Sequence, residues 1–244
     1  ALADTTHDPI IAARRPKAWS SWQRAEDYYN EGLLMWLEAD GIIRNESGGA
    51  KGLDDFALAF FGGRDGDWGQ VTYTRQDVID TLNAVHPYDW AGFLASHVDN
   101  PTNEAPKAGF ALGGYRLVYG DTPNSKTKDI EKSIGGVDQS YGIGLMVKNS
   151  GDIISVIWDS AAFKADLAVG MDIIAVNGVE FSGDRFKEAL TQAKQDRKPI
   201  ELIVKQDKNY RTLKLDYSLG LRYPRLEKTG EGEGSLDRLL QPKT

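Results

Sequence analysis

The 244-residue sequence contains no cysteine, and this absence excludes several kinds of chemistry. Disulfides, thiolate zinc sites and cysteine nucleophiles all need a thiol, so none of them operates in this chain. The lack of cysteine does not select a compartment. The sequence starts at Ala1 and shows no charged-then-apolar leader, so we expect a processed or excised chain. Its localisation, whether periplasmic, secreted or cytoplasmic, stays open.

Long apolar runs and basic runs are also missing. The longest uninterrupted apolar stretch, residues 56–63, is far shorter than the roughly 20 residues of a membrane-spanning helix. Lys and Arg number 29 against 36 Asp and Glu, which gives a net charge of -7. Nucleic acids and anionic membranes are polyanions that attract clustered positive charge. We therefore expect neither a nucleic-acid partner nor a membrane span.

Helical periodicity dominates the sequence up to about residue 113. Apolar residues recur at helical spacing in four stretches, and these are predicted as helices over residues 20–45, 53–61, 75–86 and 90–97. A capping box formed by Thr74 and Asp77 marks the start of the third helix, and Asp89 caps the fourth. His97 lies on the apolar side of the fourth helix, where we expect a partly buried, hydrogen-bonded histidine.

From Tyr115 the pattern changes to short β-rich runs separated by Gly, Asn and Asp. The predicted strands cover residues 115–119, 143–147, 153–158, 173–176, 200–205 and 210–215. One amphipathic helix, capped by Ser182, interrupts them, and a short helix capped by Ser235 ends the chain. We predict an α+β chain with a helical part at 1–112, a small β-barrel or sandwich with helices at 113–217, and a C-terminal linker and helical tail at 218–244.

Two segments of the second part resemble a PDZ domain of the bacterial, protease-associated kind: Tyr-Gly-Ile-Gly-Leu at 141–145 and Asp-Leu-Ala-Val-Gly-Met-Asp-Ile-Ile-Ala-Val-Asn-Gly at 166–178. Gly170 suits a positive-φ turn, and Asn177-Gly178 suits a tight β-turn. In PDZ domains a glycine-rich loop holds a peptide's C-terminal carboxylate, and the following strand accepts the peptide as an added strand. The implied groove consists of Tyr141, Gly142, Ile143, Gly144, Leu145, Val147, Phe186 and Leu190. The alternative is that the protein fills this groove itself and the domain is purely structural.

Residues 26–40 resemble the helix that follows the zinc site in glycyl aminopeptidase-type zinc metallopeptidases, gluzincins that end in a PDZ domain. The resemblance implies the helical C-terminal part of a thermolysin-like catalytic region. The parent protein would remove N-terminal residues, preferably Gly or Ala, from peptide substrates. A His-Glu-x-x-His zinc motif is missing, because the three histidines, His7, His86 and His97, form no i, i+4 pair. We therefore expect zinc in the parent enzyme, and neither metal nor activity in this fragment.

The same resemblance assigns a catalytic role to Tyr29, whose hydroxyl would donate to the oxyanion of the tetrahedral intermediate. The alternative is a core aromatic beside Leu33 and Trp36. Glu26 and Glu31 are candidates for binding the substrate's α-amino group, and a solvated acidic face is the alternative. Expected partners are peptide substrates, peptide C-termini at the groove, and the missing N-terminal and catalytic domains. The competing functions are a peptide-binding module and a scaffold for the catalytic domain.

Overall fold

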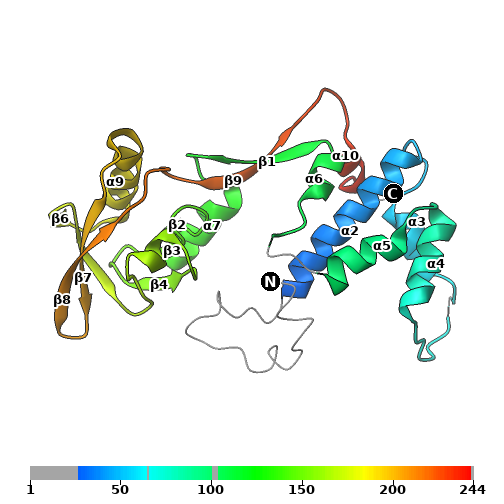
Figure 1. Cartoon of the computed structure of the whole chain (residues 1–244), viewed down its shortest axis with the longest axis horizontal. Helices are drawn as coiled ribbons and strands as arrows, with labels where there is room; N and C mark the ends of the chain where they lie inside the picture. Colours follow the sequence, from blue (N-terminus) through cyan, green and yellow to red (C-terminus); the bar gives the residue numbers. More distant parts are fainter. Residues whose placement is uncertain (1–26, 65, 101–103, 243–244) are drawn as a thin grey trace. The chain divides into compact units, whose positions relative to one another are not determined.

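The computed structural model describes residues 27–64, 66–100 and 104–242 (Figure 1). The chain divides into two compact units. The described residues up to Arg116, together with those from Leu226 onward, form the first unit, and Leu117–Arg225 form the second. The C-terminal segment therefore belongs with the helical unit rather than with the strands that precede it.

The first unit, called the helical unit below, consists almost entirely of helices. They are α2 (Asp27–Glu46), α3 (Leu53–Phe61), α4 (Arg75–Val85), α5 (Trp90–Leu94), the π-helical turn η2 (Ala95–Asp99), α6 (Ala108–Leu112) and α10 (Ser235–Leu239). The predicted helices at 53–61 and 75–86 are confirmed, the latter with the expected capping box between Thr74 and Asp77. Residues 20–26 of the first predicted helix lie outside the described residues. That helix ends near the expected place, before Gly48 and Gly49, which both have positive φ.

A buried ion pair joins α2 and α3. Asp40 on α2 is almost fully buried and accepts hydrogen bonds from the Arg44 side chain at 2.8 and 2.9 Å. Its Oδ1 also accepts from the backbone N–H of Leu53, the first residue of α3, at 2.8 Å. A charge removed from water needs such partners to offset its lost hydration. The pair therefore fixes the start of α3 against α2, where both contribute to one apolar core.

The second unit, called the β-rich unit below, contains two antiparallel sheets. Its strands are β2 (Gly136–Gln139), β3 (Leu145–Lys148), β4 (Ile153–Val156), β5 (Asp172–Val176), β6 (Val179–Glu180), β7 (Ile200–Gln206) and β8 (Asn209–Leu215). Strand orders are β2-β3-β4 and β6-β5-β7-β8, and β1 (Tyr115–Gly120) pairs separately with β9 (Tyr223–Lys228). Its helices are α7 (Ser125–Ile134), α8 (Ala161–Lys164) and α9 (Gly183–Asp196).

This arrangement confirms an α+β chain, but the described strands form no closed barrel. Among the described residues, no ladder joins the three-stranded sheet to the four-stranded sheet, although an isolated bridge pairs Asp152, just before β4, with Asp172 of β5. Apolar side chains from both sheets and from α9 fill one core between them. The predicted Asn177-Gly178 turn is confirmed: both residues have positive φ, and they connect β5 to β6 with Val176 opposite Val179.

The C-terminal helix α10 packs against α2 and α6 within the helical unit. The predicted cap Ser235 is wrong. Gly234 occupies the N-cap, and its N–H donates to the Asp237 side chain at 2.8 Å. The Ser235 hydroxyl instead donates to the backbone carbonyl of Leu112 at the end of α6, at 3.0 Å. Leu236 is buried in the same contact, so a five-residue helix too short to be stable alone is held by tertiary packing.

Candidate functional site

Tyr29, the predicted oxyanion donor, lies in the first half of α2. Its side chain is 67% exposed, and Leu33, one turn further along, is 65% exposed. Tyr29 therefore does not belong to the buried core of the helical unit, which was the alternative for this residue. Glu31 is mostly buried rather than part of a solvated acidic face. Glu26, the other candidate for the substrate's α-amino group, lies outside the described residues.

A continuous row of rings, called the aromatic ladder below, crosses the helical unit from α2 to the segment before α4. The ring centroids are 5.3 Å apart between Trp36 and Phe56 and 5.3 Å apart between Phe56 and Phe60. Phe60 then contacts Phe61 at 5.0 Å and Tyr73 at 5.2 Å. The ladder begins half-buried and ends at the surface, because Phe61 and Tyr73 are both largely exposed.

Other large apolar side chains that are close in sequence to Phe61 and Tyr73 are also exposed. Trp68 is 98% exposed, and Leu58 and Val71 are also mostly exposed. Soluble proteins rarely expose large apolar side chains in such a concentration unless a partner covers them. We name these residues and the outer ladder the exposed aromatic surface; it comprises Leu58, Phe61, Trp68, Val71 and Tyr73. Spacing alone did not predict it, because Phe61 lies on a helical stripe that usually faces a core, and Trp68, Val71 and Tyr73 lie in the non-helical segment between α3 and α4.

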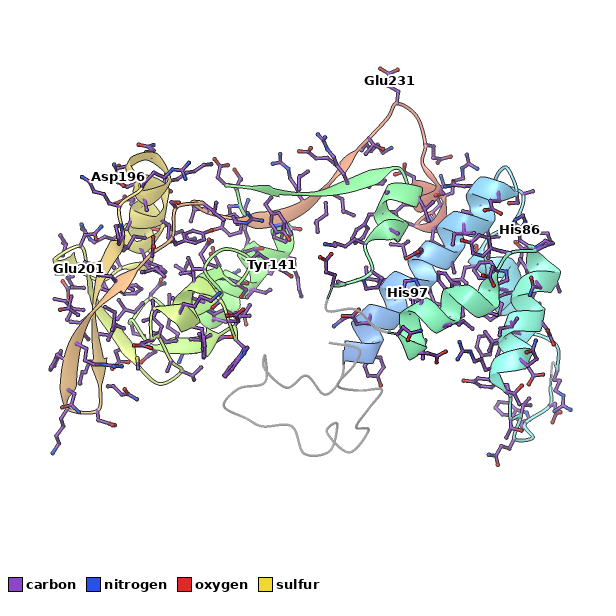
Figure 2. The ribbon with its side chains drawn as sticks, in the orientation of Figure 1. His86, His97, Tyr141, Asp196, Glu201 and Glu231 are labelled. Atoms are coloured by element: carbon purple, nitrogen blue, oxygen red, sulfur yellow. The ribbon has the colours of Figure 1, made fainter. Side chains whose placement is uncertain are left out.

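His86 and His97 lie at separate places in the helical unit (Figure 2). His86 Nε2 is 2.9 Å from a Glu46 carboxylate oxygen, and His97 Nε2 is 3.4 Å from Glu38. His97 also contacts the Phe93 ring, so it is the partly buried, partnered histidine that its position predicts. Within the described ranges, no three His, Asp or Glu side chains gather as a metal site. The described residues thus do not supply a zinc donor set.

The apolar residues of the predicted groove lie together in the core of the β-rich unit. Ile143, Leu145, Val147, Phe186 and Leu190 are all fully buried in a single cluster. In the glycine-rich loop Tyr141 is exposed (Figure 2). Gly144 has a φ of 76°. A side chain at Gly144 would collide with Ser160, which explains glycine there. The predicted residues are brought together, but largely as core.

The edge of β3 that faces this groove is already paired with β2. β3 pairs with β4 on one side and with β2 on the other, both antiparallel. The sequence-based prediction missed β2 and the helix α7 before it. The glycine pair Gly135-Gly136 and the glycine-rich loop at 141–144 bracket β2 and were the available signal. The run between them is too short and mixed to show alternation.

Polar groups close to β2 are buried as well. Burial, together with the charge of Glu131, raises the pKa of Tyr223 to about 12. The Tyr223 hydroxyl has no hydrogen-bond partner in the described part of the chain. Glu131 accepts a hydrogen bond from the backbone N–H of Asp138 at 3.1 Å and contacts Lys187 of α9 at 2.8 Å. The neighbourhood of β2 is therefore closed and polar, unlike an open peptide channel.

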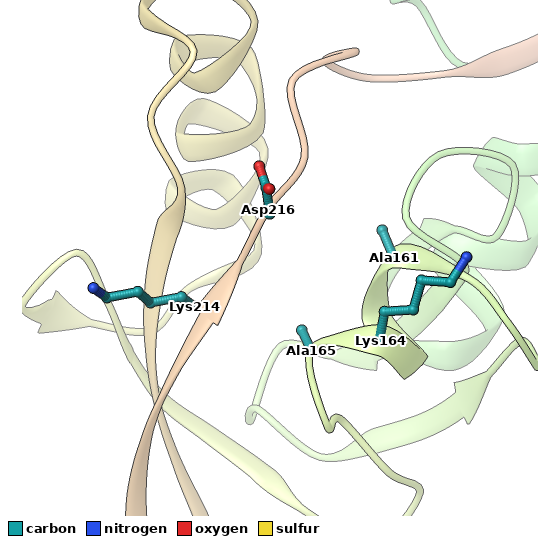
Figure 3. Close-up of a pocket in the computed structure, with 5 residues that line it drawn as sticks. All are labelled: Ala161, Lys164, Ala165, Lys214 and Asp216. Atoms are coloured by element: carbon teal, nitrogen blue, oxygen red, sulfur yellow. The ribbon is translucent and has the colours of Figure 1, made fainter.

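A depression of about 330 Å³ lies elsewhere in the β-rich unit (Figure 3). Ala161 and Lys164 of α8 and Ala165 directly after it form one wall, and Lys214 and Asp216 form the other. It shares no residue with the predicted groove, and its charges are of both signs. Along the described chain, no helix combines the length and apolar character needed to cross a membrane.

Comparison with solved structures gives a match that covers most of this chain. Neither protein-family models nor curated sequences match this chain. The structure of an aminopeptidase N family protein from Idiomarina loihiensis is similar, with a TM-score of 0.55 and 18% identity over 91% of this chain and 38% of that chain. An HtrA3 PDZ domain with a phage-derived ligand covers 47% of this chain and 91% of its own at 14% identity, but its TM-score of 0.24 supports no inference. The chain thus has a fold related to about two fifths of an aminopeptidase N family protein.

Proposed function

We propose that this chain is the C-terminal portion of a zinc-dependent aminopeptidase that releases N-terminal residues, preferably Gly or Ala, from peptides. The observation that carries the proposal is the structural similarity over 91% of this chain to only 38% of an aminopeptidase N family chain. The sequence resemblance of residues 26–40 to gluzincin peptidases points to the same class. The zinc ligands would then belong to a part of the parent protein outside this sequence, and this chain alone would be inactive.

Within this proposal the helical unit supplies a proton donor rather than metal ligands. Zinc held by the parent protein would polarise the scissile carbonyl. Tyr29 would donate its phenolic hydrogen bond to the oxyanion that develops there, because a phenol stays neutral at pH 7 and still donates strongly. Its exposed position on α2 is compatible with reaching a substrate. Glu26 and Glu31 remain the proposed contacts of the substrate's α-amino group.

The exposed aromatic surface also supports a role within a larger protein. Phe61, Trp68 and Tyr73 would stay in water if the helical unit functioned alone. Burying large apolar side chains is worth roughly 1.5 to 3 kcal/mol each, so a contact with the parent's remaining domains would be strongly favoured. The β-rich unit, whose groove apolar residues are already core, fits a scaffold for the catalytic region better than a peptide receptor.

The test of the proposed catalysis is Tyr29→Phe in the full-length parent, with Tyr73→Phe as the matched control. Tyr29→Phe keeps the ring and removes one transition-state donor, so kcat should fall about 10² to 10³ fold with little change in KM. Tyr73→Phe should leave kcat unchanged. A Tyr29→Phe enzyme that keeps more than about a third of parental kcat would remove Tyr29 from the mechanism.

A second experiment tests the assignment of zinc to the parent. After dialysis, metal analysis of the 244-residue chain should find no stoichiometric zinc, and glycyl and alanyl reporter substrates should not be cleaved. The full-length parent should hold zinc and lose its activity to a chelator. Zinc bound with turnover by the chain alone would contradict the proposal.

A further inference from the structure

The strand that an added peptide would need has no free edge. β3 is the middle strand of its sheet, with β4 along one side and β2 along the other. The β2 ladder covers the whole of β3, from Gly136 opposite Lys148 to Gln139 opposite Leu145. An extended peptide binds to a sheet by hydrogen bonding to an open edge. The chain itself therefore occupies the position that such a peptide would take.

β2 also has the direction and side-chain placement of a ligand. It runs antiparallel to β3 and toward the glycine-rich loop. Val137 and Gln139, two residues apart and thus on one face of the strand, are 2% and 0% exposed. Val137 belongs to the core cluster that contains Phe186 of α9. Its Cγ2 would lie 2.9 Å from a Cβ at Gly183, the first residue of α9, so strand and helix touch closely.

The loop donors predicted to hold a carboxylate are used by the same segment. The backbone N–H groups of Gly142 and Gly144 both donate to the carbonyl oxygen of Gln139, each at 3.0 Å. In an open site these N–H groups would turn toward the terminal carboxylate of a peptide. Here the main-chain carbonyl of Gln139 accepts both hydrogen bonds. Gln139 is the last residue of β2 and lies opposite Leu145 of β3.

Side-chain contacts anchor β2 between α7 and α9. Glu131, in the last turns of α7, uses one carboxylate oxygen to accept from the N–H of Asp138 and the other to bind Lys187 of α9. Both charged side chains are mostly removed from water. The N–H of Asn149 donates to the carbonyl of Gly135 at 2.8 Å, which fixes the start of β2.

We propose that β2 is an intramolecular ligand of the PDZ-like groove. Segment 136–139 occupies the position of a bound peptide. Val137 is its apolar anchor, and the Gln139 carbonyl binds the N–H groups of the glycine-rich loop. The resting protein is consequently closed to external peptides. When β2 detaches from β3, the groove binds an extended peptide that has an apolar side chain in the position of Val137 and a carbonyl or carboxylate in the position of the Gln139 carbonyl. The proposal does not depend on peptidase activity.

The experiment uses the full 244-residue chain and a fluorescein-labelled peptide of residues 133–139 with a free C-terminal carboxylate. The wild-type chain should show no anisotropy change up to about 1 mM protein. Val137→Asp places a charge where β2 meets the core, so it should release β2 and bind the unmodified peptide at least about tenfold more tightly than wild type. A peptide carrying the same Val-to-Asp change should not bind. Val179→Asp, at an exposed valine of β6, is the matched control and should stay closed.

A milder variant covers the case in which Val137→Asp does not fold. Glu131→Ala removes only the anchor to Asp138 and Lys187 and should also open the groove, while Glu188→Ala, at an exposed residue of α9, should not. Binding of the peptide by wild type as tightly as by the variants would overturn the proposal. So would folded Val137→Asp or Glu131→Ala chains, checked by amide NMR dispersion, that fail to bind.

Discussion

The two units differ in whether their candidate binding surfaces are covered. The β-rich unit covers its potential binding groove with β2, and the five aliphatic and phenylalanine residues of the groove are core. The helical unit instead leaves Phe61, Trp68 and Tyr73 at the surface, at the end of a ring ladder that starts near its core. A groove covered by the unit's own strand needs no partner, whereas a concentration of exposed aromatic side chains indicates a surface that a partner covers. The recognisable binding motif is thus the part of the molecule that is already covered, and the exposed aromatic surface lies in the other unit.

The largest effect is expected from a cavity in the core of the β-rich unit. Phe186→Ala should lower the free energy of unfolding of this unit by about 3 to 5 kcal/mol, since the buried ring is lost and a cavity remains. Exposed Glu188→Ala on the same helix should change it little. Denaturant titration followed by hydrogen exchange measures both. Equal loss of protection in α2 and α4 would mean that the two units do not unfold separately.

The corresponding test in the helical unit removes the buried ion pair between Asp40 and Arg44 and measures the free energy of unfolding. Asp40→Asn should cost about 2 to 3 kcal/mol, somewhat less than a fully isolated buried charge because Arg44 keeps a 3.2 Å contact with Asp54. Asp54→Asn, at a half-exposed carboxylate, should cost less than about 1 kcal/mol. Chemical denaturation of the two variants compares them. Similar losses for both would show that the Asp40 contacts to Arg44 and Leu53 are not the anchor of α3.

The attachment of α10 should depend on pH. Hydrogen bonding from Tyr115, and then contact with Lys228, hold the pKa of Asp237 down to about 2 from its ordinary 3.8. Because the folded pKa is the lower one, this stabilisation is present above pH 3.8 and is lost as the pH falls through about 2. Hydrogen exchange in α10 should therefore accelerate toward pH 2 relative to α4.

Two variants test whether the Asp237 carboxylate causes the acid dependence of α10. Asp237→Asn should weaken protection of α10 at neutral pH and remove the acid dependence. Asp196→Asn, which alters a depressed-pKa carboxyl at the end of α9, should leave α10 unchanged. An acid transition of α10 that persists in Asp237→Asn would assign it to another group.

The smallest effect on stability should come from the exposed aromatic surface. Trp68→Ser and Phe61→Ser remove side chains that are already in water, so the free energy of unfolding should stay within about 0.5 kcal/mol. Concentration-dependent self-association, measured by sedimentation velocity, should decrease in the double variant. A large loss of stability would show that these rings pack in the isolated chain and would weaken the contrast between the units.

Local rules predicted the elements whose signals lie within a few residues. The Thr74–Asp77 capping box and the apolar stripe of 53–61 produced α4 and α3 almost to the residue. α7 escaped prediction because its sequence, Ser-Lys-Thr-Lys-Asp-Ile-Glu-Lys-Ser-Ile, offers little apolar periodicity. Strand β9 escaped because its pairing with β1, more than a hundred residues earlier, has no local counterpart.

The α+β class, the positions of α3, α4 and α9, and the Asn177-Gly178 turn can be predicted from local sequence, because capping, periodicity and backbone preference act within a few residues. Whether the groove is open depends on contacts between distant segments. β2 closes it through main-chain hydrogen bonds to β3 and through Gln139, whose carbonyl takes the loop donors. Every residue type except proline carries both a main-chain donor and a main-chain acceptor, so no side-chain pattern predicts this pairing. The exposure of Tyr29 was likewise set by what packs around α2, which spacing along one helix does not encode.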